Sequence, residues 1–159
     1  MNTDKSNTGF SLIELLLVVA IIGIIAAIAV PNLLASKRAA NESSAIASIR
    51  TISSAEATYQ ATNGAGSYGS LSQLNTAGLV DSSLAGSTIV APKSGYAFTA
   101  LPDSSTPRYQ FLTTASTAVS SGLTASGSRN FASDSTGVIT YDAPSNTAMS
   151  ANNGTPIGN

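Results

Sequence analysis

One carboxylate stands out in the sequence because it lies near the start of a long apolar stretch. Between Phe10 and Val30 the only polar side chains are those of Ser11 and Glu14. An acidic group at the centre of a membrane helix costs about 2.5–3.5 kcal/mol, and less near the end. The chemistry open to Glu14 is to pair with a cation inside an assembly; the alternative is that it lies at headgroup level and binds water.

Other candidates for chemistry are few. The chain has no cysteine and no histidine, which excludes Cys/His zinc sites, thiol nucleophiles and histidine-based triads. The sequence contains no evident pairing of a nucleophile with a base and no metal-binding cluster. It therefore predicts neither an enzyme nor a cofactor, and an anchored enzyme or ligand-binding domain is the least favoured alternative.

Two patterns resemble ligand sites but have simpler explanations. Residues 64–69 spell G-x-G-x-x-G, yet a dinucleotide site needs those glycines between a strand and a helix, and here they follow a long helical pattern. Asp134 and Asp142 fall short of the roughly six to eight oxygen ligands that calcium takes. We interpret the glycines as loop residues and the two aspartates as a turn residue and a strand-end residue.

The apolar stretch is long enough to cross a bilayer. As a helix rising about 1.5 Å per residue, residues 10–30 reach roughly 31 Å. The short leader, residues 1–9, precedes the apolar run, whereas a Sec-type signal has its apolar region before the cleavage site. Basic residues flank the stretch on both sides, so charge does not decide its orientation.

This arrangement resembles the amino-terminal signature of type IV pilins and type II secretion pseudopilins. The resemblance rests on a polar leader ending in Gly9, then Phe10, then Glu14, then an Ile/Leu/Val/Ala helix up to Pro31, and it extends to about Tyr59. It implies that a prepilin peptidase cuts between Gly9 and Phe10 and methylates the new amino terminus of Phe10. It also implies an amino terminus on the cytoplasmic side.

The resemblance further implies a mode of assembly. The Phe10 ammonium of one subunit would pair with Glu14 of a neighbour, so that neither charge is left alone among apolar helices. The segment from Gly23 to Pro31 would lose helicity when subunits join; the alternative is an ordinary anchor kinked at the proline. The implied partners are further copies of the chain, the prepilin peptidase, and an inner-membrane assembly platform with its ATPase.

Beyond Pro31 the pattern becomes amphipathic. Projected at about 100° per residue, one broad face carries apolar side chains and is expected to pack against a head domain. The helix is expected to end between Ala61 and Asn63, at the Asn63-Gly64 breaker, and a short capped turn is expected at 70–74. The apolar face comprises Ala35, Ala39, Ala45, Ile46, Ile49, Ile52 and Tyr59.

The rest of the chain predicts a small antiparallel sheet of about four strands. Residues 134–137 supply the turn of the last hairpin. Residues 114–128 are expected to form a loop, with a poor strand within them as the alternative, and residues 144–159 a frayed tail. Without cysteine, packing alone must hold this head. The expected strands are 95–100, 108–113, 129–133 and 138–141.

The predicted fold class is therefore α+β, in four segments. These are a leader (1–9), a transmembrane and assembly half of the helix (10–30), an amphipathic half (31–63) and a globular head (64–159). The predicted function is that of a structural subunit of a type IV pilus-like filament. Before assembly the chain would lie in the bacterial inner membrane, and afterwards in a surface filament or a periplasmic pseudopilus.

Several alternatives stay open within this interpretation. The chain could be a pseudopilin of type II secretion or a minor pilin, although the proline-, tryptophan- and asparagine-bearing loop typical of major pseudopilins is not obvious. Only 9% of residues are charged and the net charge is −1, so composition does not support nucleic-acid binding, and DNA contact through the head stays open. Two sequons, at 41–43 and 153–155, leave glycosylation open.

Overall fold

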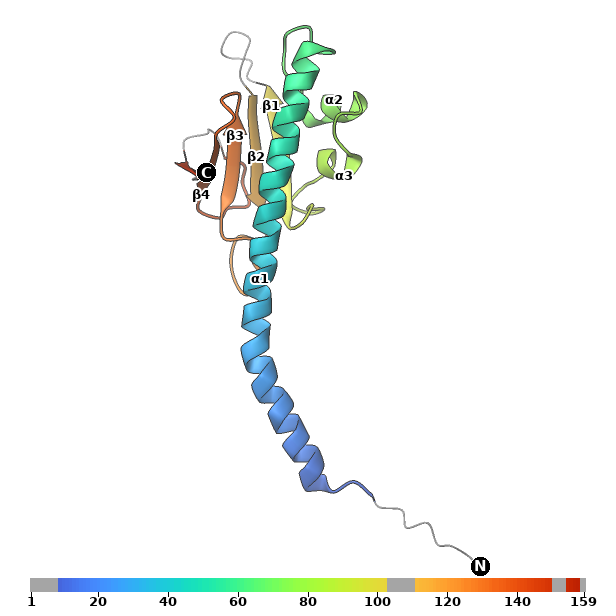
Figure 1. Cartoon of the computed structure of the whole chain (residues 1–159), viewed down its shortest axis with the longest axis vertical. Coiled ribbons are helices and arrows are strands. Elements are labelled where there is room, and N and C mark those ends of the chain that lie inside the picture. The colour runs from blue at the N-terminus through green and yellow to red at the C-terminus, as the bar shows by residue number, and fades with distance from the viewer. Residues whose placement is uncertain (1–8, 103–110, 150–153, 158–159) are drawn as a thin grey trace, which may run out of the picture. The chain divides into compact units, whose positions relative to one another are not determined.

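The computed structural model describes residues 9–102, 111–149 and 154–157 of the 159-residue chain. The chain divides into two compact units, Met1–Ala35 and Ser36–Asn159. The long helix α1 (Leu12–Ala61) contributes to both units (Figure 1). Its end at Ala61 falls where the sequence predicted it.

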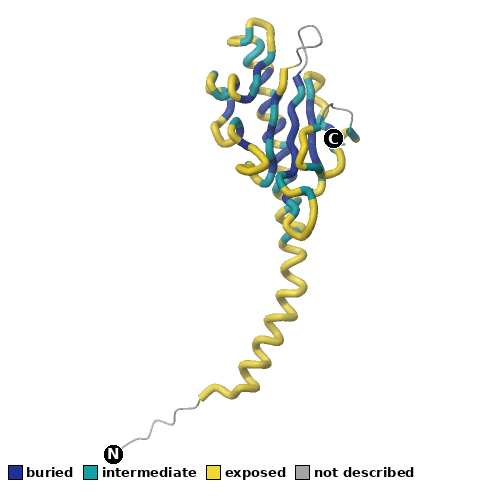
Figure 2. Tube along the Cα trace, turned by 180° about the vertical axis from the view of Figure 1, so that it is seen from behind, coloured by how far each residue is buried: buried dark blue, intermediate teal, exposed yellow. Residues whose placement is uncertain are grey.

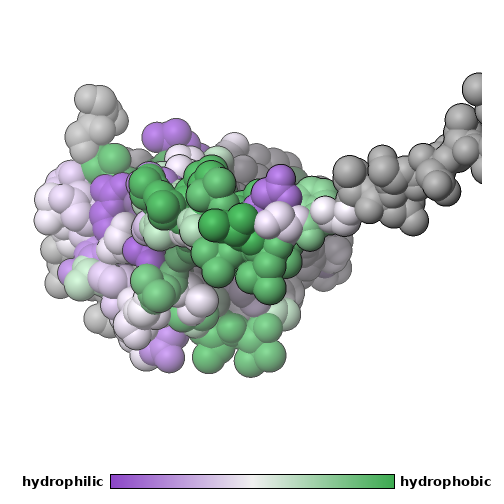
Figure 3. Space-filling model, turned by 90° about the horizontal axis from the view of Figure 1, so that it is seen from below, coloured by the Kyte–Doolittle hydropathy of each residue, from purple (hydrophilic) through white to green (hydrophobic). Residues whose placement is uncertain are grey.

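The first unit contains no core among its described residues. Every residue from 9 to 33 is exposed, and the apolar window of α1 that is long enough to cross a membrane is not buried at all. The apolar side chains of this segment form a broad green area in Figure 3. The helix continues without interruption through Gly23 and Pro31, so the proline that was expected to kink or loosen it does not break it.

The second unit is built on a five-stranded antiparallel sheet. Each strand pairs with its neighbour in the sequence, giving the order β1-β2-β3-β4-β5 and a meander of hairpins. The predicted α+β class is confirmed. The strands are β1 (Tyr96–Pro102), β2 (Phe111–Thr117), β3 (Asn130–Asp134), β4 (Ile139–Asp142) and β5 (Thr155–Pro156).

The second half of α1 packs along one face of this sheet (Figure 1). Figure 2 shows the buried parts of the chain in dark blue, in the strands and in this half of the helix. On the sheet the core side chains alternate along the strands, as in Tyr96 and Phe98 of β1. The buried residues of α1 are Glu42, Ala45, Ser48, Ile49, Ile52, Ala55 and Glu56.

Ala35 and Ala39 are exposed, although the projection placed them on the buried face. Burial of α1 begins only at Glu42, because the apolar stripe needs a partner element and the core is formed by residues from Ala45 onward. Periodicity identifies a face of a helix but not how far along the helix that face is covered.

Two short helices connect α1 to the sheet. Helix α2 (Leu71–Thr76) begins with a capping box, in which Ser70 and Gln73 each satisfy the backbone N–H of the other. Helix α3 (Ser82–Ala85) is capped by Asp81, whose side chain accepts from the Leu84 N–H. The capped turn expected at 70–74 is therefore present and two residues longer, while α3 was not predicted.

The strand boundaries correct the prediction in two places. Strand β2 runs on to Thr117, so the expected loop at 114–128 begins four residues too early; the first three residues of the predicted strand 108–113 lie outside the described residues. The tail was expected to fray, but Thr155 and Pro156 pair with β4 as β5, and Ile157 packs against the core.

The tail is also tied to the sheet before β5. The Asn130 amide donates to the carbonyls of Ser145 and Thr147, at 2.8 and 3.4 Å. Ser116 and Thr117 of β2 donate their hydroxyls to the same two carbonyls. Polar side chains of the sheet therefore satisfy backbone carbonyls of the tail. These hydrogen bonds hold this part of the tail although its sequence has no apolar pattern.

Candidate functional site

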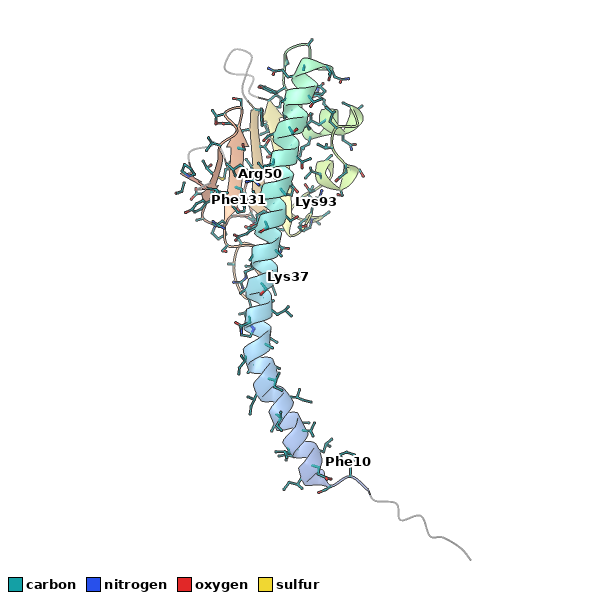
Figure 4. All side chains as sticks on the ribbon, in the orientation of Figure 1. Phe10, Lys37, Arg50, Lys93 and Phe131 are labelled. Carbon is teal, nitrogen blue, oxygen red and sulfur yellow. The ribbon has the colours of Figure 1, made fainter. Side chains whose placement is uncertain are left out.

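The two residues of the predicted cleavage site come before the first helical turn. Gly9 and Phe10 have no regular secondary structure and are exposed. Figure 4 shows the Phe10 side chain at the start of α1, and 86% of its surface is accessible. A peptide bond in such a segment is accessible to a protease without unfolding of a core.

Glu14 lies in the first turn of α1 and has a hydrogen-bond partner within its own chain. Its Oε2 accepts the Ser11 backbone N–H at 2.9 Å, which satisfies one of the N–H groups that every helix start leaves free. A negative charge at this end also suits the helix dipole. Sequence reasoning missed this role, although Ser11-Leu12-Ile13-Glu14 is the S-x-x-E pattern of a capping box. The carboxylate keeps acceptor capacity for a cation.

Gly23 and Pro31 lie further along the same exposed helix. A methyl group added at Gly23 would meet no heavy atom within 4 Å, so the glycine is not required by packing within the chain. Pro31 is inside α1 and leaves its continuity intact. Glu14, Gly23 and Pro31 thus follow one another along one helix at about 1.5 Å per residue, and Gly9 and Phe10 precede it. They do not converge on a pocket, and the arrangement suits an extended contact surface rather than a catalytic centre.

The glycines of the G-x-G-x-x-G pattern serve the packing of a loop. They follow α1 and precede α2, with no strand before them. A Cβ at Gly69 would come within 2.9 Å of the Tyr59 ring, and one at Gly64 would overlap the Ser67 carbonyl oxygen and come within 3.0 Å of the same ring. The Gly69 N–H donates to Glu56. Close approach to Tyr59 therefore explains Gly69, and close approach to the Ser67 backbone explains Gly64.

Three polar side chains on α1 hold the loop that precedes β3. Arg38 donates to the carbonyls of Gly122 and Leu123, and the Asn41 amide donates to the Ser126 carbonyl at 2.8 Å. Asn41 belongs to one of the two sequons, so its amide nitrogen is engaged in the fold. Asn153 of the other sequon lies outside the described residues.

The third of these side chains is Glu42, which is buried. Its Oε1 accepts the Ser128 N–H at 2.7 Å and the Ser128 hydroxyl at 2.6 Å, and its Oε2 accepts Nη2 and Nε of Arg129 at 2.7 and 3.1 Å. Burial alone would raise the pKa of Glu42, but these hydrogen bonds and the guanidinium charge outweigh it and lower the pKa below its ordinary value. The result is a satisfied ion pair that fastens α1 to β3.

The two aspartates considered for calcium occupy the positions expected of them. Asp134 Oδ1 accepts the Thr136 N–H and hydroxyl in the β3–β4 turn, where Gly137 supplies a positive φ of 75°. Asp142 ends β4 and accepts the Ala143 N–H. Within the part of the chain that the structure describes, no three His, Cys, Asp or Glu residues are grouped to hold a metal.

The amino-terminal segment has relatives among known proteins. Residues 4–30 match the prokaryotic N-terminal methylation motif. The chain carries a prepilin-type amino-terminal segment. The resemblance to type IV pilins and pseudopilins, inferred from Gly9, Phe10 and Glu14, is confirmed for the amino-terminal segment.

Three curated proteins illustrate the range of this similarity. A type IV wide pilus major component of Thermus thermophilus is 55% identical over 38 residues, which cover 24% of this chain and 29% of that protein. A type II secretion system core protein G of Vibrio cholerae is 38% identical over 63 residues, 40% of this chain and 43% of the relative. A type IV major pilin of Myxococcus xanthus is 43% identical over 56 residues, 35% and 26%. The matches thus span less than half the length of each relative. No solved structure matches the chain significantly.

Proposed function

We propose that this chain is a structural subunit of a type IV pilus-like filament and polymerises through the first half of α1. The observation that carries the proposal is the continuous exposure of residues 9–33, an apolar helical surface with one carboxylate at its start. A surface of this kind has to be covered by lipid or by other helices. Lipid covers it while the subunit lies in the inner membrane, and copies of the same helix cover it in the fibre.

Processing supplies the charge that Glu14 needs. Cleavage between Gly9 and Phe10 leaves a cationic, N-methylated amine four residues before Glu14. In an apolar fibre both charges must be paired. The Ser11 N–H occupies one oxygen of Glu14, and the remaining acceptor capacity takes the Phe10 ammonium of an adjacent subunit. A prepilin peptidase performs the cut, and a platform with an ATPase lifts the processed subunit into the growing fibre.

A role as a pseudopilin of type II secretion, or as a minor pilin, is the second candidate. It is favoured by the match to the Vibrio cholerae secretion protein, which extends over more of this chain than the other two. The discriminating measurement is abundance in material sheared from cells. A dominant band supports a major pilin, and a trace band supports the second candidate.

The test of the filament proposal is mass spectrometry of the chain recovered from sheared fibres. The expected amino terminus is an N-methylated Phe10. Recovery of fibres whose subunits still begin at Met1 would contradict the processing step. Recovery of the trimmed chain only as a monomer in its native host would contradict polymerisation.

A further inference from the structure

Glu56 is a second buried carboxylate on α1, and it has only part of the hydrogen bonding that a carboxylate can accept. Its side chain is fully buried. Oε2 accepts the Gly69 N–H at 2.9 Å, whereas Oε1 is buried without a hydrogen-bond partner among the described residues. Burial of a charged oxygen without a partner is costly, and the neutral acid lowers that cost.

The hydrogen bond from Gly69 fastens a loop that turns back at the end of α1. In this loop, residues 64–69, Gly64 and Gly66 donate their N–H groups to the carbonyls of Tyr59 and Gln60. Tyr68 sets its ring edge against Phe111 of β2, with centroids 4.9 Å apart. Ser70, the cap of α2, follows directly. The Glu56 side chain therefore links α1 to the backbone from which α2 begins.

We propose that Glu56 is a proton-controlled latch, which holds loop 64–69 closed on α1 as a neutral acid and favours opening of the loop when it loses its proton. When the loop is open, water can hydrate the Glu56 carboxylate. When the loop is closed, the carboxylate is buried and has no access to water. The inference concerns the head alone and does not depend on the proposed filament.

The electrostatics around Glu56 agree with this geometry. Burial raises the pKa of Glu56 to about 7, against the lowering effect of the Gly69 N–H, and no charge of another side chain contributes. Helix α2 and strand β2 carry no titratable side chain. Tyr59 on α1 and Tyr68 in the loop carry the phenols nearest to Glu56 in the sequence. The other titratable side chains in the described part of the head are the phenols of Tyr96 and Tyr141, the carboxyls of Glu42, Asp81, Asp134 and Asp142, and the cations Lys37, Arg38, Arg50, Lys93 and Arg129.

The direction of the pH effect follows from the raised pKa. The closed loop holds the Glu56 proton more tightly than an open loop, where the carboxyl has an ordinary pKa near 4.5. Closure is therefore fully supported at acid pH and is weakened as the pH rises from about 4.5 to about 7. Above that window no further change is expected from this group.

Hydrogen exchange of the full-length chain in detergent micelles tests the latch. After correction for the intrinsic pH dependence of exchange, protection of residues 64–69 should fall about tenfold or more between pH 5 and pH 8, since each unit of pKa difference is a tenfold preference. Glu56→Gln keeps an oxygen for the Gly69 N–H but cannot ionise, so its protection should not change with pH. Glu42→Gln, at the other buried carboxylate of the same face, should retain the wild-type pH dependence of the loop.

Two results would overturn the latch. One is wild-type protection that stays constant between pH 5 and pH 8, and the other is a Glu56→Gln variant that shows the same fall. If Glu56→Gln does not fold, carboxyl-carbon NMR of the wild-type chain decides the matter. Titration of the Glu56 carboxyl near 7 is the expected result, and its titration near 4.5 excludes the proposal.

Discussion

The Glu42 carboxylate and the Arg129 guanidinium lie 2.7 Å apart and join α1 to the start of β3 across 87 residues of sequence. Arg129 also lies over the rings of Phe131 and Tyr141, at 5.5 and 5.0 Å from their centroids. The planar guanidinium of arginine can bind a carboxylate through two nitrogens and lie over aromatic rings at the same time, whereas the ammonium of lysine cannot. This ion pair fixes where the helix crosses the sheet.

Glu42→Gln should lower the free energy of unfolding at pH 7 by about 1–3 kcal/mol, because Arg129 loses its anionic partner while Ser128 keeps an acceptor. The measurement is thermal unfolding of the full chain in detergent. The pKa of Glu42 is lowered in the fold, so the stabilisation is present above its ordinary value and is lost as the pH falls below it. Equal effects of the substitution at pH 7 and pH 3 would contradict this assignment.

A matched control for Glu42→Gln is Lys93→Met, which removes the ion pair between Lys93 and Asp81. Those two groups lie 3.1 Å apart, but the Asp81 side chain is 61% exposed. Exposed pairs are screened by solvent. This variant should leave the unfolding midpoint nearly unchanged.

Glu14→Ala and Glu14→Gln separate two roles of the same carboxylate. The amide oxygen of glutamine can still accept the Ser11 N–H, but it carries no charge for a neighbouring ammonium. We expect both variants to insert into membranes normally and to reduce the yield of sheared fibres at least about tenfold, a loss of 1.4 kcal/mol or more per contact. Normal fibres from Glu14→Gln would show that helix capping, not charge pairing, is what assembly needs.

Thr113 and Thr117 make a matched pair on β2. Both side chains are fully buried, but the Thr113 hydroxyl has no hydrogen-bond partner among the described residues, whereas the Thr117 hydroxyl donates to the Ser145 carbonyl. Thr113→Val should be neutral or stabilising by up to about 1 kcal/mol. Thr117→Val should destabilise by about 0.5–1.5 kcal/mol, because the Ser145 carbonyl loses one donor but keeps the Asn130 amide. Chemical unfolding of the two variants measures the difference, and similar losses for both would count against the hydrogen bonds described here.

Gly23→Ala tests the proposed loosening of the helix. Alanine meets no steric obstacle at this position and should stabilise the helix by about 1 kcal/mol. If helicity between Gly23 and Pro31 is lost on assembly, this variant should insert normally and yield fewer fibres. Circular dichroism in micelles and quantification of sheared fibres measure the two effects. Unchanged fibre yield together with increased helicity would argue against the loosening.

The sequence was sufficient for the features that depend on local pattern. The apolar run to Val30, the helix end at Ala61, the cap at Ser70 and the Asp134 turn all follow from residue types at fixed spacing. So did the aromatic strands of the sheet. The prepilin-type signature likewise depends on a few residues close together in the chain.

The features that were missed depend on contacts between distant segments. The end of β2 consists of Thr, Ala and Ser residues whose strand character comes from burial and from the tail that covers them. Glu42 and Glu56 continue the buried stripe of α1, but a hydropathy projection places charged residues outside a core. Their partners, Arg129 and Gly69, are identified only when the fold brings them together.

Ahead of β5, the tail is attached to the sheet through the main-chain carbonyls of Ser145 and Thr147, which accept from Ser116, Thr117 and Asn130. These hydrogen bonds depend on where the tail backbone lies and not on which side chains the tail carries. Substitutions at positions 145 and 147 should therefore cost little beyond the exposed hydrogen bonds of the Ser145 hydroxyl with Thr147, while the three donors on the sheet tolerate far less change. Variation between strains should accumulate on this stretch of the tail and be scarce at Asn130.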